Sequence, residues 1–522
     1  MVSWPRRTHD DERLARRLSP GDAVVIGLGS MIGAGVFAAF GPAAGAAGAG
    51  LLIGLVIAAV IAYCNAVASA QLAAAYPTSG GTYVYGRERL GAWWGFTAGW
   101  GFVVGKTASC AAMALTVAAY AVPGPWWAQR AVAVTSVLGL AALNYRGVTR
   151  TAALTRVLVA ASLAALLVVV VGIAVGGQVS TANLHWSGTG GVYGILQAAG
   201  LLFFAFAGYA RIATMGEEVR DPRRTIPRAI PRALLIAVAV YLVVGTAALL
   251  AAGPDLLAAS STPLTTAVQE AGAGALAPVV RIGATLASLG ALLALIAGIG
   301  RTSLAMARHA DLPHWLAAVH HRYRVPHHAE IAVAVVVSAL AATVDLRGVI
   351  GFSSFGVLVY YAIANAAAFT QPATDRRWPR WLNILGAAGC LALIATLPWQ
   401  SVVIGLAVFG IGIIGRGIVL TRRRHRRPRH DQTPRPRPRP TRHPRLRIRP
   451  GHPTQHLTSP TAAGQPLKQQ LGIPRPGFEQ DITRNATSRI TPQPAHPARE
   501  TALPQPASQG RPAGHRPPDE SR

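Results

Sequence analysis

The residues best suited to bind a ligand form a glycine-rich stretch inside an apolar segment near the N-terminus. Residues 27–37 read GLGSMIGAGVF and contain Gly27, Gly29, Gly33 and Gly35. A glycine in a helix interior costs about 1 kcal/mol relative to alanine, so the pattern predicts a break in a helix. A break exposes N–H groups that attract a carboxylate and carbonyl oxygens that accept hydrogen bonds from an ammonium group. Close packing of small residues, as in Gly29-x-x-x-Gly33, explains the spacing equally well.

A second apolar segment carries a similar interruption. Residues 203–230 read FFAFAGYARIATMGEEVRDPRRTIPRAI, in which Gly208 and Arg211 interrupt an apolar sequence. The two segments are the first and sixth of the membrane spans that the sequence predicts. If the first ten spans form two halves of five, these two segments occupy the same position in each half. Paired interruptions at corresponding positions indicate the binding site of a transporter. A zwitterionic substrate suits such a site, whereas a sugar or a metal ion does not require it.

Two basic side chains, Lys106 and Arg211, lie within predicted spans. A charge at the centre of a bilayer costs roughly 2.5–3.5 kcal/mol on insertion scales, so we expect Lys106 to face a cavity and to act in coupling or gating. A fixed structural cation that pairs with carbonyl groups is the alternative. For Arg211, the sequence leaves open a contact with substrate and a cytoplasmic-side gate that pairs with Glu217 or Glu218.

The composition excludes an ordinary water-soluble enzyme, because 51% of the residues are hydrophobic and 13% are charged, against about 25% charged in soluble domains. Cys64, Cys110 and Cys390 lack the spacing of a metal site or a redox pair. The histidines of HHRYRVPHH are expected to be solvated loop residues rather than metal ligands. With no recognisable catalytic motif, we expect no enzymatic activity, no metal and no cofactor.

A membrane-spanning helix needs about 20 mostly apolar residues. On this basis the sequence predicts twelve spans, at residues 22–41, 50–72, 92–120, 130–145, 155–175, 193–214, 230–252, 279–300, 329–344, 349–370, 382–397 and 400–420. Arginines are concentrated in alternate connecting segments, which by the positive-inside rule places both termini in the cytoplasm. Residues 1–21 are predicted to be a cytoplasmic extension and residues 22–421 the transporter core.

The C-terminal residues 422–522 differ from the rest in composition. They are rich in Pro, Arg, Gln, Thr and Ser, and such a segment cannot bury enough apolar surface to fold alone. We expect a disordered cytoplasmic tail. It either contacts anionic lipid through its charge or has no specific partner, and no specific nucleic-acid partner is predicted.

Four motifs, in order, resemble the amino acid permeases of the amino acid–polyamine–organocation (APC) superfamily. They are GSMIGAGVF (29–37), YPTSGGTYVYGRERLG (76–91), residues 203–230, and RTSLAMARHADLPHWLAAVHHRYRVPHHAE (301–330). The resemblance implies an all-α polytopic membrane protein. It further implies twelve transmembrane helices, with a five-plus-five inverted repeat (LeuT-like) and two extra helices, that works by alternating access.

The resemblance also implies roles for particular residues. The backbone N–H groups around Ser30, Ile32, Gly33, Ala34 and Gly35 would hold the substrate carboxylate. Carbonyl oxygens near Gly27, and near Phe204, Ala205 and Ala207 beside Gly208, would face the ammonium group. Phe204 lies where the family has an aromatic gate, and one more packed aromatic is the alternative.

Coupling is the least determined part of the expected mechanism. Ser162 takes the position at which many relatives carry a lysine linked to proton coupling. Its hydroxyl would help a sodium site or simply pack. Coupling to a proton or to sodium therefore stays open.

Together these features predict a secondary active transporter that moves amino acids across the cytoplasmic membrane, with the lipid bilayer as its surroundings. The alternative is a polyamine or organic-amine transporter or exchanger. A non-transporting membrane receptor is a further alternative, which the paired helix breaks disfavour. The sequence does not specify which amino acid is carried, the direction of transport or the oligomeric state.

Overall fold

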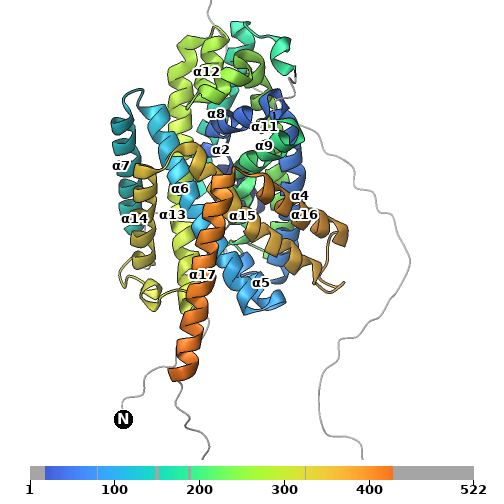
Figure 1. Cartoon of the computed structure of the whole chain (residues 1–522), viewed down its shortest axis with the longest axis vertical. Coiled ribbons are helices and arrows are strands. Elements are labelled where there is room, and N and C mark those ends of the chain that lie inside the picture. The colour runs from blue at the N-terminus through green and yellow to red at the C-terminus, as the bar shows by residue number, and fades with distance from the viewer. Residues whose placement is uncertain (1–17, 79, 147–151, 186–189, 324, 427–522) are drawn as a thin grey trace, which may run out of the picture. The chain divides into compact units, whose positions relative to one another are not determined.

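The computed structural model describes residues 18–78, 80–146, 152–185, 190–323 and 325–426, which form a bundle of helices (Figure 1). Within these ranges the only β pairing is an isolated bridge between Leu18 and Val219. The N-terminal residues 1–17 and the tail from residue 427 lie outside the described residues, so the predictions made for these two segments stay predictions.

The helices and 3-10 helices (η) follow one another closely along the chain. In order they are α1 (Pro20–Met31), α2 (Ala34–Ala38), α3 (Phe40–Ala47), η2 (Gly48–Gly50), α4 (Leu51–Ala75), α5 (Thr82–Leu90), α6 (Ala92–Ala121), α7 (Trp126–Tyr145), α8 (Ala152–Gly176), η3 (Thr181–Leu184), α9 (Gly191–Phe206), η4 (Ala207–Tyr209), α10 (Ala210–Ala213), α11 (Pro222–Ala259), α12 (Pro263–Glu270), η5 (Gly274–Leu276), α13 (Ala277–Arg308), η6 (His314–Ala317), α14 (His327–Thr343), α15 (Leu346–Phe369), α16 (Arg380–Thr396) and α17 (Trp399–Arg426).

Each predicted span coincides with helical structure, and the expected all-helical membrane class is confirmed. Nine segments of the described chain are long and apolar enough to cross a membrane. The predicted spans at α7, α14 and α16 are not among them. α14 and α16 have 17 residues each, about 25 Å of helix against a hydrocarbon core of about 30 Å. The count of twelve therefore stays a prediction.

The central helix of the bundle is α6, which packs along α13 and α15. In its most apolar stretch 89% of the residues are buried, against 22% in α17, which lies on the outside of the bundle in Figure 1. Glycines allow α6 and α15 to approach closely, because a Cβ on Gly356 would lie 2.8 Å from Gly105 Cα. Small residues at this spacing are typical of helix contacts in membranes.

The start of α1 is fixed by its own cap and by a neighbouring helix. The backbone N–H of Asp22 donates to Ser19 Oγ at 3.2 Å, and the Asp22 carboxylate accepts from the Ser19 N–H at 3.0 Å. This is a capping box, with Pro20 at the first helical position. Arg156 of α8 donates from Nε to the same carboxylate at 3.1 Å. The cap thus also joins α1 to α8.

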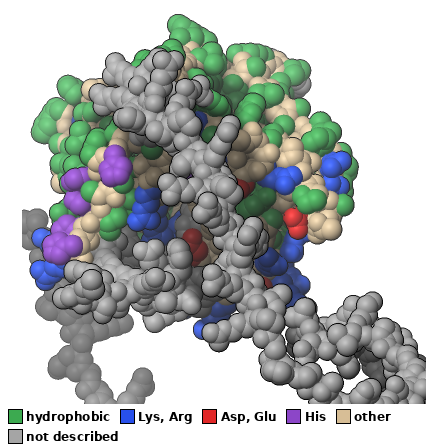
Figure 2. Space-filling view, turned by 90° about the horizontal axis from the view of Figure 1, so that it is seen from below, with side chains coloured by type: hydrophobic (Ala, Val, Ile, Leu, Met, Phe, Trp, Pro, Cys, Tyr) green, Lys and Arg blue, Asp and Glu red, His purple; other side chains and the backbone are tan. Residues whose placement is uncertain are grey.

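Seen from below, Lys, Arg and His side chains gather at the end of the bundle that carries α5, while hydrophobic side chains cover its flanks (Figure 2). Large apolar side chains are widely exposed, including Val175 at 80%, Leu235 at 70% and Ile411 at 69%. Exposed apolar surface on this scale indicates contact with an apolar environment, and the interior of a lipid bilayer is such an environment.

Candidate functional site

The first predicted span is broken, as expected from its glycines. α1 ends at Met31 and α2 begins at Ala34, and between them Ile32 (φ −80°, ψ 77°) and Gly33 (φ −137°, ψ −139°) leave the helical conformation. The first turn of any helix has N–H groups without an intrahelical acceptor. All five residues of α2 are buried, so the break places the first turn of this helix inside the bundle.

The sixth predicted span is interrupted in a different way. α9 ends at Phe206, the three residues Ala207–Tyr209 form the 3-10 helix η4, and α10 follows at Ala210. A 3-10 segment inside a helix changes the hydrogen-bond register from i+4 to i+3, and such segments frequently mark functional positions. The predicted interruption around Gly208 is confirmed.

The two interruptions contact each other directly. A Cβ on Gly35 would lie 2.5 Å from Ala205 Cα, and one on Gly208 would lie 2.1 Å from the Ser30 carbonyl oxygen. A Cβ on Gly29 would lie 2.8 Å from Val159 of α8. The glycines thus both accompany the breaks and permit close packing, so the two explanations of the glycine spacing hold together.

Side chains from three other helices hold the carbonyl oxygens at the breaks. The Tyr241 hydroxyl of α11 lies 2.7 Å from the Met31 oxygen and 3.1 Å from the Ala205 oxygen, and it donates to this pair. The Lys106 ammonium of α6 donates to the Ala207 oxygen at 3.0 Å, and the Tyr361 hydroxyl of α15 donates to the same oxygen at 3.2 Å.

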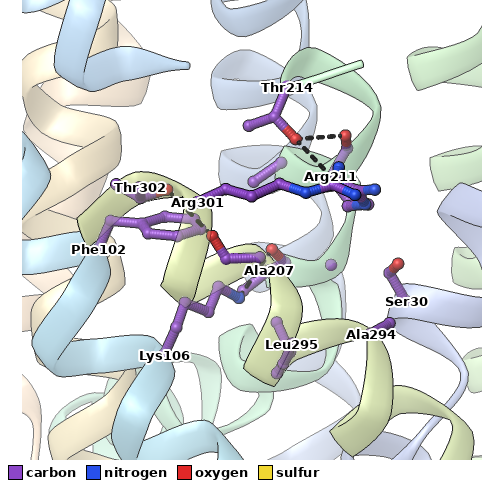
Figure 3. A pocket seen from close by; sticks show the side chains of 13 residues that line it. Ser30, Phe102, Lys106, Ala207, Arg211, Thr214, Ala294, Leu295, Arg301 and Thr302 are labelled. Carbon is purple, nitrogen blue, oxygen red and sulfur yellow. Dashed lines mark hydrogen bonds between the residues drawn. The ribbon is translucent and has the colours of Figure 1, made fainter. Parts of the chain in front are cut away.

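A cavity lies beside these contacts (Figure 3). Its lining comes from α1, α6, η4, α10, α13 and the residue after α10, and consists of Ser30, Phe102, Lys106, Ala207, Gly208, Ala210, Arg211, Thr214, Ala294, Leu295, Gly298, Arg301 and Thr302. It brings together five of the residues singled out in the sequence, namely Ser30, Lys106, Ala207, Gly208 and Arg211. Lys106 is 4% exposed and lies against Ala207, as Figure 3 shows.

The other predicted binding residues do not line this cavity. A Cβ on Gly27 would lie 2.3 Å from Ile212 Cδ1, and one on Gly33 would lie 2.7 Å from Ala291 Cβ. Ala34 and Phe204 belong to a hydrophobic cluster that includes Met113, and Phe204 is 7% exposed. This burial corresponds to the packed alternative for Phe204.

A second cavity lies between α1, α8 and α13. Its lining includes Ser30 and Ile32 of the first broken span and Ser162 of α8. Ser30 Oγ donates to the Ile26 carbonyl at 2.9 Å and Ser162 Oγ donates to the Leu158 carbonyl at 2.7 Å. Each hydroxyl donates its proton to a carbonyl of its own helix, so its oxygen still has lone pairs that can accept a hydrogen bond or bind a cation.

Two arginines at one end of the first cavity share a carboxylate. Arg301 Nη1 lies 2.9 Å and Arg211 Nη2 lies 3.8 Å from the same oxygen, Glu218 Oε1. Glu218 is one of the two partners predicted for Arg211. The backbone around Glu218 also binds the residue that precedes α1. The Leu18 N–H donates to the Glu218 carbonyl at 3.1 Å, and the Arg220 N–H donates to the Leu18 carbonyl at 3.0 Å.

The sequence did not single out Tyr241, Tyr361, Phe102 or Arg301. Tyr241 carried a usable signal, because it is the single tyrosine in the apolar predicted span 230–252 and a buried tyrosine hydroxyl usually has a hydrogen-bond partner. Arg301 follows the predicted span 279–300 directly, in a segment that the sequence predicts to be a loop. In the structure α13 continues to Arg308, which carries Arg301 to the cavity.

Away from the cavity, Asp311 links α5 and α17. It accepts from Arg87 at 3.1 Å, from Arg416 at 2.8 Å and from the Tyr83 hydroxyl at 2.9 Å. Burial, together with the charge of Asp311, raises the pKa of the Tyr83 phenol above its usual value. The Arg416 guanidinium also lies 4.6 Å from the centre of the Trp93 ring, a cation–π contact.

The histidines near residue 320 pack with aromatic rings. His320 Nδ1 accepts from the N–H groups of Arg322 and Tyr323 at 3.2 Å and 3.3 Å, and its ring lies 5.4 Å from that of Tyr145. Over the described ranges, no group of three His, Cys, Asp or Glu side chains is arranged to hold a metal ion.

Comparisons with known proteins point to one family. A family model described as "Amino acid permease" matches residues 18–415. An uncharacterized transporter of Mycobacterium tuberculosis is 58% identical over 80% of this chain and 94% of its own length. A branched-chain amino acid permease of Bacillus subtilis is 26% identical over 78% and 93%. A cationic amino acid transporter of Arabidopsis thaliana is 26% identical over 76% and 72%.

Proposed function

The chain belongs to the amino acid permease family, and on that premise we propose that it is a secondary active transporter that carries an amino acid across the cytoplasmic membrane by alternating access. Relatives named as amino acid permeases and transporters support the amino acid as cargo. The exposed apolar flanks and nine long apolar helices in the described residues support a multi-pass membrane protein.

The observation that carries the proposal is the contact between two broken helices beside a cavity. The first turn of α2, beginning at Ala34 and Gly35, would offer N–H groups for the substrate carboxylate. The N–H groups of Ile32 and Gly33 donate to the Leu28 and Met31 oxygens, and Ser30 lies in α1, so these three would act through their position at the break. The carbonyl oxygens near Gly27 and at Phe204–Ala207 accept from the ammonium group. Because Lys106 donates to the Ala207 oxygen, an arriving ammonium competes with Lys106 for this acceptor. Substrate binding would thereby shift α6 relative to η4.

For the fold we propose twelve transmembrane helices with an inverted repeat. The first five spans are α1 with α2, α4, α6, α7 and α8, and the second five are α9 with α10, α11, α13, α14 and α15. α16 and α17 are the two extra helices. The basic end of the bundle in Figure 2 supports a cytoplasmic orientation of that end.

Coupling is proposed to involve Lys106 or Ser162. Lys106 lines the first cavity, and Ser162 lines the second cavity together with Ser30 of the broken first span. Uptake by proteoliposomes under a proton gradient alone and a sodium gradient alone identifies the driving ion. Loss of the sodium response in Ser162→Ala, with Thr285→Ala of α13 as a control, would assign the sodium role to Ser162. An unchanged response would contradict it.

Two other candidate functions make different predictions. A polyamine would bring two or more positive charges into a cavity lined by Lys106, Arg211 and Arg301. A receptor that signals through residues 422–522 would lose its output when they are deleted, whereas a transporter keeps its uptake.

The first test is a thermal-shift screen of the purified protein against the twenty amino acids and common polyamines. A ligand at 100 times its dissociation constant stabilises a protein by about 2.7 kcal/mol. We expect stabilisation by one class of amino acid, followed by uptake of that class into proteoliposomes. Stabilisation by polyamines alone, or by none of these compounds in folded protein, would contradict the proposal.

A further inference from the structure

The cavity beside the two broken helices carries an unbalanced positive charge. Within the part of the chain that the structure describes, its lining includes Lys106, Arg211 and Arg301 and no Asp or Glu. Beside the lining, the Glu218 carboxylate contacts both arginines, and the buried Glu330 of α14 packs against Gly300, next to Arg301. Arg211 and Arg301 thus share one carboxylate, whereas Lys106 is bound to the Ala207 carbonyl oxygen.

The three basic groups come from separate helices, and Lys106 is buried and hydrogen-bonded. Lys106 belongs to α6, Arg211 to α10 and Arg301 to α13. Lys106 is 4% exposed and donates to the Ala207 oxygen. Burial of an ammonium group at this depth without an anionic partner has a high cost, so the site favours a ligand that supplies negative charge.

Arg211 has capacity left for a further partner. Its guanidinium has five N–H donors. It donates to Thr214 Oγ1 at 3.3 Å, and its separation from Glu218 is 3.8 Å, beyond hydrogen-bond length. Glu218 is held more closely by Arg301, at 2.9 Å. A carboxylate in the cavity can therefore bind Arg211 while Glu218 remains with Arg301.

We propose that the cavity selects an amino acid with a second carboxylate in its side chain, of the glutamate or aspartate type, and that this carboxylate pairs with Arg211. The inference rests on the proposed function, because it names the substrate class of the same site. The α-carboxylate and α-ammonium bind at the broken helices. The side-chain carboxylate brings a negative charge into a lining that has three basic groups and, among the described residues, no acidic one.

The proposal separates this chain from relatives with other named substrates. A branched-chain side chain would leave the Arg211 guanidinium without a carboxylate partner. A cationic side chain would add a fourth positive charge beside Lys106, Arg211 and Arg301. Glutamine is the sharpest comparison, because it has the size and shape of glutamate and differs in charge.

The test uses the full-length protein in proteoliposomes, with uptake and competition measured for glutamate, aspartate, glutamine, lysine and leucine. We expect glutamate or aspartate to compete at a concentration at least about tenfold lower than glutamine, as one charge-assisted hydrogen bond would give. Equal or better competition by glutamine, leucine or lysine would overturn the inference and leave the proposed function standing.

Glutarate has two carboxylates and no amino group. It distinguishes failure of the proposed amino acid transport from failure of the proposed selectivity for a side-chain carboxylate. If glutarate stabilises the protein in a thermal-shift assay and no amino acid does, amino acid transport is contradicted and the anion-selective cavity is supported. If neither glutarate nor any amino acid stabilises folded protein, both proposals are overturned.

Two substitutions test the role of Arg211. Arg211→Gln should bring the preference for glutamate over glutamine close to one, whereas Arg308→Gln, an exposed arginine on α13 that does not line the cavity, should keep it. Glu218→Gln removes the negative charge beside both arginines, so a substrate carboxylate at Arg211 no longer has a like charge nearby and the affinity for glutamate should increase. This variant keeps the test valid if Arg211→Gln fails to fold. An unchanged preference in Arg211→Gln, or weaker glutamate binding in Glu218→Gln, would contradict the pairing.

Discussion

The Lys106 ammonium on α6 donates a hydrogen bond of 3.0 Å to the carbonyl oxygen of Ala207, the first residue of η4. This contact connects the central helix of the bundle to the interruption of the sixth predicted span. It also explains a basic residue inside an apolar segment, because a backbone carbonyl oxygen has two lone pairs and the Ala207 oxygen accepts from the buried ammonium.

Substitution of Lys106 by methionine keeps the length of the side chain and removes its charge. We expect transport to fall at least about tenfold, because a hydrogen bond to a charged group is worth about 1.5–3 kcal/mol. The melting temperature should stay equal or rise, since a buried charge has been replaced by an apolar group. Uptake and thermal unfolding measured in parallel check this expectation.

Thr107→Val is the matched control for Lys106, because Thr107 is the next residue of α6 and lines a different surface groove. It should leave uptake unchanged. Normal transport with a lowered melting temperature in Lys106→Met would instead support the structural-cation alternative.

The Tyr241→Phe substitution removes the hydroxyl that donates to the carbonyl oxygens of Met31 and Ala205. Its loss should destabilise the protein by about 1–3 kcal/mol, the cost of leaving a buried polar group unsatisfied. Thermal unfolding in detergent measures the effect. Tyr193→Phe, at a position 55% exposed, should have no measurable effect, and equal stability of the two variants would rule out this role for Tyr241.

Gly35→Ala and Gly208→Ala should both disrupt the contact between the two breaks. Each new Cβ would lie within 2.6 Å of backbone atoms of the opposite segment, and overpacking of this kind costs about 1–3 kcal/mol. We expect reduced stability and loss of uptake. Gly139→Ala and Gly410→Ala, where a Cβ meets nothing within 4 Å, should be neutral or stabilising. Full uptake by the Gly208 variant would show that the close approach is dispensable.

Asp311→Asn should destabilise the protein by about 3–5 kcal/mol, because it leaves a buried arginine without its anionic partner. The side chains of Arg416 and Asp311 are 6% and 4% exposed. The exposed Asp375→Asn serves as the control, with thermal unfolding as the measurement. If the Asp311 variant matches the control, the ion pair contributes nothing to stability.

The helix breaks were predictable because their cause is local. Glycines at 27–35 and around 208 weaken a helix whatever surrounds it, and the cost of a buried charge correctly placed Lys106 toward a cavity. The acceptor of Lys106 was not predictable, because Ala207 is 101 residues away and their contact depends on how α6 packs. The same holds for Tyr241 and Met31, which are 210 residues apart.

Other differences have equally specific causes. Phe204 lies in a run of three phenylalanines, FFAF, in which hydropathy alone cannot distinguish a gating ring from a packed one. The end of α13 differs from the predicted one because the apolar pattern stops at residue 300, while the helix continues through Arg301 to Arg308. The Arg301 side chain therefore lines the cavity from the last turns of α13, a segment whose composition predicts a loop.

The bridge between Leu18 and Val219 gives the protein a built-in position for a reporter. Because backbone hydrogen bonds tie residue 18 to the segment that carries Glu218, the beginning of α1 has to follow any displacement of that segment. A spin label or fluorophore attached at residue 18, paired with one on the exposed flank of α17, would record the opening and closing of the basic end of the cavity without altering any group that lines it.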